Sequence, residues 1–371
     1  MENREIKREF YLSKLIEKKG NGFIKVITGI RRCGKSYLVF KQFKNHLLLN
    51  GVDKEHIFEM VFDDRRNAKY RNPDVFDELV DSQIGDGGIY YILLDEVQML
   101  DDFEGVLNGL LRRHEVDIYV TGSNAKFLSR DVITEFRGRG DEVHLNPLSF
   151  SEFMSAYDGN KYDGWNEYVQ FGGLPPVVLQ QNTESKIKTL NDLNKETYIR
   201  DITSRHNIRN KAEFEELLNV LASGIGALAN PTKLADTFKT KKKIKISKNT
   251  IDSYIDYLID AFFVEKAQRY DIKGKKYIDT PFKYYFSDIG LRNAQIGFRQ
   301  IEETHIMENV IYNELRIRGY NVDIGVVNTA ELKSDGKKQK KQLEIDFVCN
   351  KASKRYYIQS AFALPDSKKT E

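Results

Sequence analysis

A glycine-rich segment placed directly after an apolar run limits what this chain can fold into more than any other feature. Residues 29–36 read Gly-Ile-Arg-Arg-Cys-Gly-Lys-Ser and follow the apolar run of residues 23–28. Residues 37–43 continue with the spacing of an amphipathic helix. A strand, a glycine loop and a helix in this order cradle phosphate, because the backbone N–H groups of the loop and the helix dipole both favour an anion. The segment therefore predicts a phosphate loop within an α/β fold.

The side chains of this loop are candidate contacts to a nucleoside triphosphate. Lys35 is placed to reach the β and γ oxygens, and the hydroxyl of Ser36 is placed to hold Mg²⁺. The alternative is a chance match of a flexible loop, which the order of strand, loop and helix disfavours. The expected nucleotide-binding set is Gly29, Arg31, Arg32, Cys33, Gly34, Lys35, Ser36 and Tyr37.

A second apolar run ends in two adjacent carboxylates. Residues 89–94 are almost continuously apolar, which suits a parallel strand buried on both faces, and Asp95 and Glu96 follow. We expect Asp95 to hold Mg²⁺ and Glu96 to polarise an attacking water. An adjacent Asp-Glu pair is typical of hydrolytic ATPases rather than of small switch GTPases, so ATP is the expected nucleotide. The alternative is a solvated strand end.

Polar and basic residues follow a third apolar run, residues 117–120. Asn124 comes shortly after it and is expected to contact the γ-phosphate or the water, although a plain strand-to-turn junction explains the same residues. Arg137 and Arg139 are candidates for the guanidinium that stabilises charge on the transferred phosphoryl group, from the same chain or a neighbour. A solvated basic loop is the alternative for both.

The chain resembles the prokaryotic AAA-type ATPases that carry a C-terminal domain of unknown function. That resemblance implies a P-loop NTPase sheet of the ASCE type, doubly wound, and a kinship with the archaeal ATPases of the STAND group. It also implies a winged-helix module and a restriction-endonuclease-like tail behind the motor domain. The motifs that carry the resemblance are residues 29–36, 94–98, 121–124, 137–140, 147–150 and 172–175.

Composition indicates a large globular chain of two or three domains, since 371 residues with 40% hydrophobic content supply several cores. The first residues lack the apolar core of a signal peptide, and no run approaches about 18 apolar residues. We therefore expect a cytoplasmic protein without a membrane span. The two cysteines, Cys33 and Cys349, allow neither a disulfide framework nor a zinc site.

The net charge of +3 is small, so the case for nucleic acid rests on local features. Residues 231–238 and 251–263 have the pattern of two helices, and residues 264–278 follow as a hairpin, which together predict a winged helix. In a DNA reader Lys248 and Asn249 would face base edges, while Lys273 and Lys275 would meet phosphates. The alternative is a rigid lid or a dock for a protein partner.

The last region resembles a restriction-endonuclease-like core built on Glu308, Asp346 and Gln359. Such cores gather Mg²⁺ with carboxylates and use a lysine beside them. Here Gln359 stands where a carboxylate belongs and Ala361 where the lysine belongs, so nuclease activity is not expected. We expect a degenerate domain, truncated relative to the family.

The expected organisation is an ATPase domain (1–150), a helical lid or linker (151–190), a winged-helix module (191–298) and the nuclease-like domain (299–371). The expected function is Mg²⁺-dependent ATP hydrolysis coupled to binding of duplex DNA or a protein partner. The alternative is a switch or scaffold that holds ATP without turnover. The sequence is also compatible with a homo-oligomer.

Overall fold

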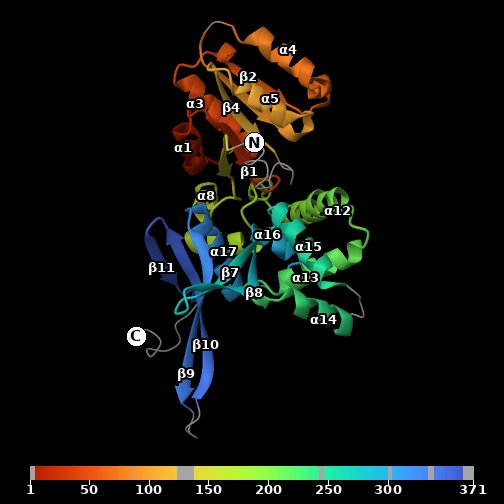
Figure 1. Cartoon of the computed structure of the whole chain (residues 1–371), viewed down its shortest axis with the longest axis vertical. Helices are drawn as coiled ribbons and strands as arrows, with labels where there is room; N and C mark the ends of the chain where they lie inside the picture. Colours follow the sequence, from red (N-terminus) through yellow and green to blue (C-terminus); the bar gives the residue numbers. More distant parts are fainter. Residues whose placement is uncertain are drawn as a thin grey trace. The chain divides into compact units, whose positions relative to one another are not determined.

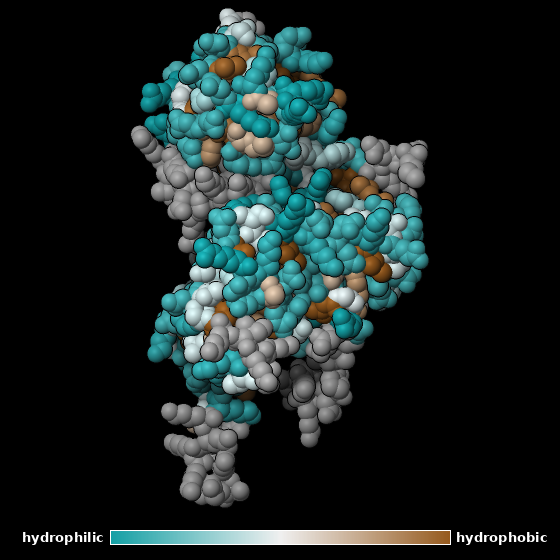
Figure 2. All heavy atoms as spheres, turned by 90° about the vertical axis from the view of Figure 1, so that its right-hand side faces the viewer, coloured by the Kyte–Doolittle hydropathy of each residue, from teal (hydrophilic) through white to brown (hydrophobic). Residues whose placement is uncertain are grey.

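The chain divides into two compact units, Met1–Pro147 and Leu148–Glu371. The computed structural model describes residues 5–85, 87–122, 138–241, 246–299, 303–332 and 338–361. Figure 2 shows hydrophilic residues over most of the face that it presents, with hydrophobic side chains scattered among them. Within those described ranges, no helix has the length and apolarity needed to cross a membrane.

The first unit is built on a five-stranded parallel sheet with the order β2-β3-β4-β1-β5. The two apolar runs predicted as strands are β1 and β3, and every residue in both is buried. Continuous burial is expected when helices cover both faces of a parallel sheet. The strands are β1 (Ile24–Thr28), β2 (Ile57–Val61), β3 (Tyr90–Asp95), β4 (Val116–Thr121) and β5 (Gly140–His144).

Helices cover both faces of this sheet (Figure 1). On one face, Phe76 of α4 and Leu107 of α5 share a core with Ile92 and Val120 of the strands. On the other face, Phe43 packs its ring against Tyr119 with 4.4 Å between centroids. The helices are α1 (Glu9–Glu17), α2 (Lys35–Tyr37), η1 (Leu38–Phe43), α3 (Lys44–Leu49), η2 (Lys54–His56), η3 (Arg65–Arg71), α4 (Pro73–Gln83), η4 (Val97–Met99) and α5 (Phe103–Leu110).

The second unit contains a six-stranded sheet with the order β11-β10-β9-β7-β8-β6. Strand β7 pairs in parallel with β9, with Arg269 opposite Ile324. The segments expected as a winged-helix module and a nuclease-like domain therefore contribute strands to one sheet. The strands are β6 (Leu228–Ala229), β7 (Val264–Asp271), β8 (Lys276–Phe286), β9 (Asn321–Leu332), β10 (Lys338–Lys351) and β11 (Lys354–Ile358).

Helix α17 lies on one face of that sheet, where Tyr312 stacks on Tyr285 with 4.2 Å between ring centroids and packs with Phe347. The remaining helices come largely from the segment before β7 (Figure 1). The helices of this unit are α8 (Phe150–Ser155), α9 (Lys161–Phe171), α10 (Pro175–Val178), α11 (Thr183–Asp192), η5 (Leu193–Ile199), α12 (Arg200–Arg205), α13 (Lys211–Ser223), α14 (Pro231–Lys241), α15 (Lys248–Asp260), α16 (Ile289–Gln295) and α17 (Glu303–Ile317).

A buried carboxylate explains the Gly-Gly-Leu-Pro motif of residues 172–175. Asp288 caps α16 by accepting the Leu291 N–H at 3.0 Å, and it also accepts the Gly173 N–H at 2.8 Å. Gly172 has φ +75°, and a Cβ there would lie 2.3 Å from Asp288 Oδ1. Burial raises the pKa of Asp288 to about 6, against the backbone hydrogen bonds that lower it. The motif is thus a close packing of backbone around a carboxylate.

Candidate functional site

The turn between β1 and α2 depends on glycine at its first position. Gly29 has φ +135°, and a Cβ there would lie 2.1 Å from the carbonyl oxygen of Leu145. No side chain fits this approach, because the neighbouring atom is backbone. Arg32 and Gly34 also have positive φ, 62° and 102°. The chain therefore curls tightly before α2 begins at Lys35.

Lys35 places its ammonium over this curled backbone. The side chain is only 6% exposed. Its Nζ donates to the carbonyls of Gly29 at 2.9 Å and of Ile30 at 3.1 Å. The charge thus lies at the mouth of the loop and at the start of the helical run α2-η1-α3, where an anion is favoured.

Ser36 and Asp95 come together although 59 residues separate them in the sequence. The Ser36 hydroxyl donates to Asp95 Oδ1 at 2.9 Å. Thr121, at the end of β4, donates its hydroxyl to the same oxygen. The strand order explains the convergence, because β3, β4 and β1 are neighbours and their carboxyl ends meet at one edge. Thr121 had no predicted role, since a threonine at a strand end has many ordinary uses.

The protonation of Asp95 depends on two opposing effects. Burial raises the pKa of this carboxyl, which is 8% exposed, and the nearby carboxylate of Glu96 adds to the rise. Hydrogen bonds from Thr121 and Ser36 lower it. A cation placed beside Asp95 would favour its ionised form.

The donor set at this edge fits Mg²⁺. The Asp95 carboxylate and the Ser36 hydroxyl are hard oxygen ligands of the kind that Mg²⁺ prefers. Within the described part of the chain, no group of three or more His, Cys, Asp or Glu side chains is arranged to hold a metal ion. Phosphate oxygens and water would therefore complete the shell, as is usual for Mg²⁺ at phosphate sites.

Glu96 follows Asp95 in a left-handed backbone conformation, with φ 52°. Its side chain is half-buried, and Oε2 accepts a hydrogen bond from the Gln98 amide. The carboxylate thus lies at the carboxyl end of β3, beside the Asp95 pair. A partner on the carboxylate restrains its orientation, which matters for any role in orienting water.

The other loop side chains predicted to contact nucleotide differ in exposure. Cys33 is fully buried, while Tyr37 is 43% exposed. Arg31 is half-buried and Arg32 is exposed. Burial, with a contribution from the Glu5 carboxylate, raises the pKa of Tyr37.

The structure does not bring Arg139 to the phosphate loop. Its carbonyl accepts the Ile24 N–H at 2.9 Å, which places it at the amino ends of β1 and β5. The loop follows the carboxyl end of β1, about 16 Å away for a five-residue strand. The parallel pairing thus separates the two within one chain. Arg137 and Asn124 lie outside the described residues.

The candidate DNA contacts are exposed in the second unit. Lys248 opens α15 and pairs with Asp252 at 3.3 Å, and Asn249 follows it. Lys273 and Lys275 lie in the turn between β7 and β8. The helices α14 and α15 precede this hairpin in the order that the sequence predicted.

The three residues of the predicted vestigial nuclease site separate into two networks. Asp346 Oδ2 accepts the Ser360 N–H at 2.7 Å, and its own N–H donates to Gln359 Oε1 at 3.4 Å. Glu308 instead accepts the Lys283 ammonium at 2.9 Å and the Tyr285 hydroxyl at 2.6 Å.

Lys283 also pairs with Glu344 at 2.7 Å, so an ammonium lies between two carboxylates of that second network. Among the residues with described positions, no hydrogen bond or ion pair joins Glu308 to Asp346. The structure therefore joins Asp346 to Gln359 by a hydrogen bond, while Glu308 is held by Lys283 and Tyr285.

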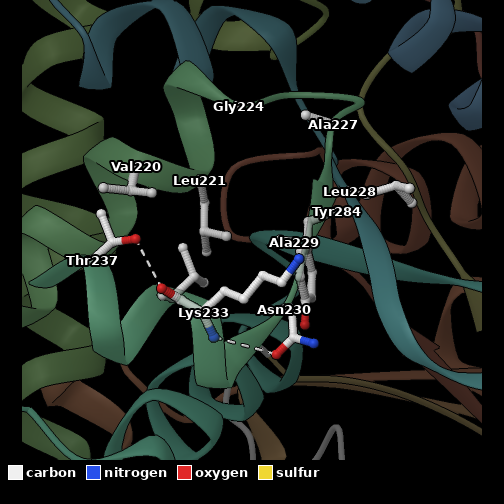
Figure 3. A pocket seen from close by; sticks show the side chains of 11 residues that line it. Val220, Leu221, Gly224, Ala227, Leu228, Ala229, Asn230, Lys233, Thr237 and Tyr284 are labelled. Carbon is white, nitrogen blue, oxygen red and sulfur yellow. Dashed lines mark hydrogen bonds between the residues drawn. The ribbon is translucent and has the colours of Figure 1, made fainter.

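The second unit also has a small open cavity of about 170 Å³ between α13, β6, α14 and β8. Val220 and Leu221 form part of an apolar wall, and the Lys233 side chain extends across the cavity (Figure 3). Tyr284, which is 3% exposed, closes it from the sheet. No sequence signal pointed to this cavity, because its walls come from four separate elements.

Comparison with known proteins agrees with the two-part organisation. Residues 21–154 match the family model described as an AAA domain, and residues 162–302 match a domain of unknown function (DUF8612). An uncharacterized protein of Haemophilus influenzae is 34% identical over 373 residues, covering 99% of this chain and 89% of that protein. An uncharacterized protein of Methanocaldococcus jannaschii is 27% identical over 364 residues, covering 93% and 76%.

Solved structures are more distant. Cdc6p from Pyrobaculum aerophilum is 11% identical, with 83% of this chain and 96% of that chain covered and a TM-score of 0.32. The identity and coverage of the Haemophilus influenzae relative do show kinship. The chain belongs to the same protein family as that relative, with an AAA domain of α/β fold and a parallel five-stranded sheet followed by a domain of unknown function.

Proposed function

We propose that the first unit binds ATP with Mg²⁺ and hydrolyses it. The observation that carries the proposal is the convergence of Lys35, Ser36 and Asp95 at one edge of the sheet, with Ser36 Oγ 2.9 Å from Asp95 Oδ1. A buried ammonium and a helix start favour a polyphosphate, while the hydroxyl and carboxylate pair favours its counter-cation. The AAA-domain match over residues 21–154 supports the same conclusion.

Each side chain has a distinct part in this proposal. Lys35 exchanges its two carbonyl partners for phosphate oxygens, which are better acceptors because they are charged. Ser36 and Asp95 hold Mg²⁺, which when bound neutralises charge on the phosphoryl oxygens. Glu96 accepts a proton from, or orients, the attacking water at the carboxyl end of β3.

Phosphate release from ATP tests the proposal. Wild-type protein should release phosphate only with Mg²⁺, and Glu96→Gln should abolish turnover while ATP still binds. Lys35→Ala should lose both binding and turnover. Lys41→Ala is the matched control, because Lys41 is an exposed lysine on η1, in the helical segment that follows the loop. Equal turnover in wild type and Glu96→Gln would refute the role given to Glu96.

A specific contact favours a second candidate, a nucleotide switch that turns over slowly or not at all. The Gln98 amide donates a hydrogen bond to the Glu96 carboxylate, which restricts the rotation of the proposed base. In a switch, wild type would bind ATP and release no phosphate. Gln98→Ala tests this reading, because release of the restraint should raise turnover above that of wild type. Unchanged turnover in Gln98→Ala would remove the argument for the switch.

The proposed coupling runs through the second unit, with duplex DNA or a protein as the partner. Lys248, Asn249, Lys273 and Lys275 are the proposed DNA contacts, on α15 and on the hairpin that follows. Lys273→Glu with Lys275→Glu should weaken duplex binding and flatten its salt dependence, since each phosphate contact contributes to that slope. Lys266→Glu on β7 is the control for added negative charge, as Lys266 is exposed and outside the proposed contacts. Equal binding by all three proteins would leave a protein partner as the candidate.

Self-association is part of the proposal because Arg139 lies at the far end of its own sheet. A guanidinium supplied by Arg139 would then come from a neighbouring copy, while Arg137 stays a candidate from the same chain or a neighbour. Turnover per chain should rise with protein concentration, and an Arg139→Ala chain mixed with wild type should lower the rate. Turnover per chain that is constant with concentration, together with a mixture whose rate is the plain average of the two proteins, would exclude a finger from another copy.

A further inference from the structure

A buried arginine ahead of α1 connects the phosphate loop to another part of the first unit. Arg8 is 3% exposed. One end of its guanidinium donates to the Cys33 carbonyl at 3.0 Å, inside the phosphate loop. The other donates to the Asn146 carbonyl at 2.7 Å. One planar group thus joins two backbone segments that are more than a hundred residues apart in the sequence.

The segment around Asn146 is the last part of the first unit, which ends at Pro147. Leu145 donates its N–H to Thr28 at 2.9 Å, and its carbonyl oxygen lies against Gly29. The Tyr11 hydroxyl is 3.3 Å from both the backbone and the side-chain nitrogen of Asn146. The exit from the first unit is therefore packed against the first residue of the phosphate loop.

Arg8 is itself held in place from the helix that follows the loop. Its N–H donates to Gln42 Oε1 at 3.2 Å, and Gln42 Nε2 donates to the Ile6 carbonyl at 2.8 Å. The guanidinium also lies over the Tyr11 ring, 4.7 Å from its centroid. The Gln42 amide holds the backbone of Arg8, and the Tyr11 ring restrains its guanidinium, so the side chain loses little further entropy when it orients a carbonyl.

The orientation of the Cys33 carbonyl determines where the next amide points. In a planar trans peptide the C=O of one residue and the N–H of the next face opposite ways. Holding the Cys33 carbonyl toward Arg8 therefore directs the Gly34 N–H to the other side of that peptide. Such N–H groups are what a phosphate loop offers to its ligand.

We propose that Arg8 is a positioning residue that orients the phosphate loop and couples it to the segment that leaves the first unit. The coupling to nucleotide rests on the proposed ATP site, whereas the orientation of the loop does not. Nucleotide that pulls on the loop amides shifts the Cys33 peptide, and Arg8 transmits that shift to Asn146. The plain alternative is an arginine that only stabilises the fold.

The labelling rate of the Cys33 thiol tests the orientation of the loop in the absence of nucleotide. Cys33 and Cys349 are both fully buried, and each lies in a different unit. In a Cys349→Ser background, Arg8→Ala should raise the rate at which an aromatic disulfide reagent labels Cys33 by about tenfold. That ratio corresponds to the free energy lost when one good hydrogen bond to the loop is removed. Lys7→Ala, which removes an exposed charge from the same segment, should not change it.

Cys349 in a Cys33→Ser background separates loosening of the loop from unfolding of the chain. If Arg8→Ala unfolds the protein, both thiols become reactive, and Arg8→Lys then serves as the milder variant. Lysine keeps the charge but cannot hold both carbonyls in one plane. Selective labelling of Cys33 in either variant is the expected result. Equal Cys33 labelling in the parent and both Arg8 variants would overturn the proposal.

Hydrogen exchange tests the coupling. With ATP and Mg²⁺, the amides of Leu145 and Asn146 should exchange more slowly in wild type, because their partners become fixed. In Arg8→Ala, ATP should still protect residues 29–36 but not Asn146. Protection of Asn146 that is equal in both proteins would refute coupling through Arg8. Absence of any protection in wild type would instead refute the proposed ATP site, and the thiol result would stand alone.

Discussion

Replacement of Lys283 by Met should leave a carboxylate uncompensated inside the second unit. Lys283 and Glu308 have side chains that are 5% and 8% exposed, and their charged atoms lie 2.9 Å apart. Burial lowers the pKa of Lys283, but the carboxylates of Glu308 and Glu344 outweigh burial and raise it. The ammonium is therefore charged at neutral pH. Met keeps the volume of the side chain and removes only the charge and its hydrogen bonds.

The expected loss is about 3 kcal/mol, the lower part of the range of roughly 3–5 kcal/mol for breaking a buried ion pair. The lower part applies because the Tyr285 hydroxyl still donates to Glu308. The Glu344 side chain is 34% exposed and is solvated when its partner is lost. Removing the charge of the partner as well, in Lys283→Met with Glu308→Gln, should restore most of the stability.

Trp165 makes the assay specific to the second unit. It is the only tryptophan of the chain, it belongs to α9, and its ring packs edge-on against Phe150 at 5.4 Å. Urea unfolding followed by its fluorescence gives a free energy of unfolding for the parent, both single variants and the double variant. The ion pair accounts for the effect if the double variant has a clearly larger free energy of unfolding than Lys283→Met. A Lys283→Met variant within about 0.5 kcal/mol of the parent would refute the reasoning, since that is the usual size of surface effects.

Three further predictions concern substitutions of single residues. Gly29→Ala should abolish ATP binding and lower the melting temperature, because its Cβ would lie 2.1 Å from the Leu145 carbonyl oxygen. Calorimetry that finds the ATP affinity and the melting temperature unchanged would contradict the loop geometry. Thr121→Val should weaken Mg²⁺-dependent ATP binding by about tenfold, since loss of one hydrogen bond raises the pKa of Asp95 further. ATP affinity measured at increasing Mg²⁺ concentrations tests this prediction. An unchanged affinity would argue against Asp95 as a ligand. Asp288 has a folded pKa of about 6 against 3.8 for the free group, so the folded state binds more protons between these values. Its contribution to the free energy of unfolding should fall by about 3 kcal/mol as pH rises through that window; Asp288→Asn should flatten this part of the pH profile, and an equal slope in both proteins would be inconsistent with the assignment.

The phosphate loop and the Asp95–Glu96 strand end could be predicted from the sequence because their signals are local. A continuous apolar run indicates a doubly covered parallel strand, and polar residues after such runs meet at one edge of the sheet. Both features of the structure follow from patterns of contiguous residues. The winged-helix and nuclease-like assignments of the second unit stay predictions.

The remaining features depend on contacts between distant segments. Parallel pairing of β7 with β9 joins residues 269 and 324, and no local pattern specifies that register. Arg139 is near β5 in the sequence, but the direction of the strand places it at the opposite end from the loop. Arg8 precedes α1 as one charged residue among many. Its role depends on where residues 33 and 146 meet, which only the fold determines.

Calorimetric titration of the protein with ATP, in the presence and absence of Mg²⁺, tests the central claim most directly. Wild type and Lys41→Ala should bind one ATP per chain, more tightly with Mg²⁺ than without it. Lys35→Ala should bind at least about tenfold more weakly, because charged hydrogen bonds to phosphate contribute roughly 1.5–3 kcal/mol each. Equal affinity of wild type and Lys35→Ala, or binding that ignores Mg²⁺, would contradict the assignment of this site.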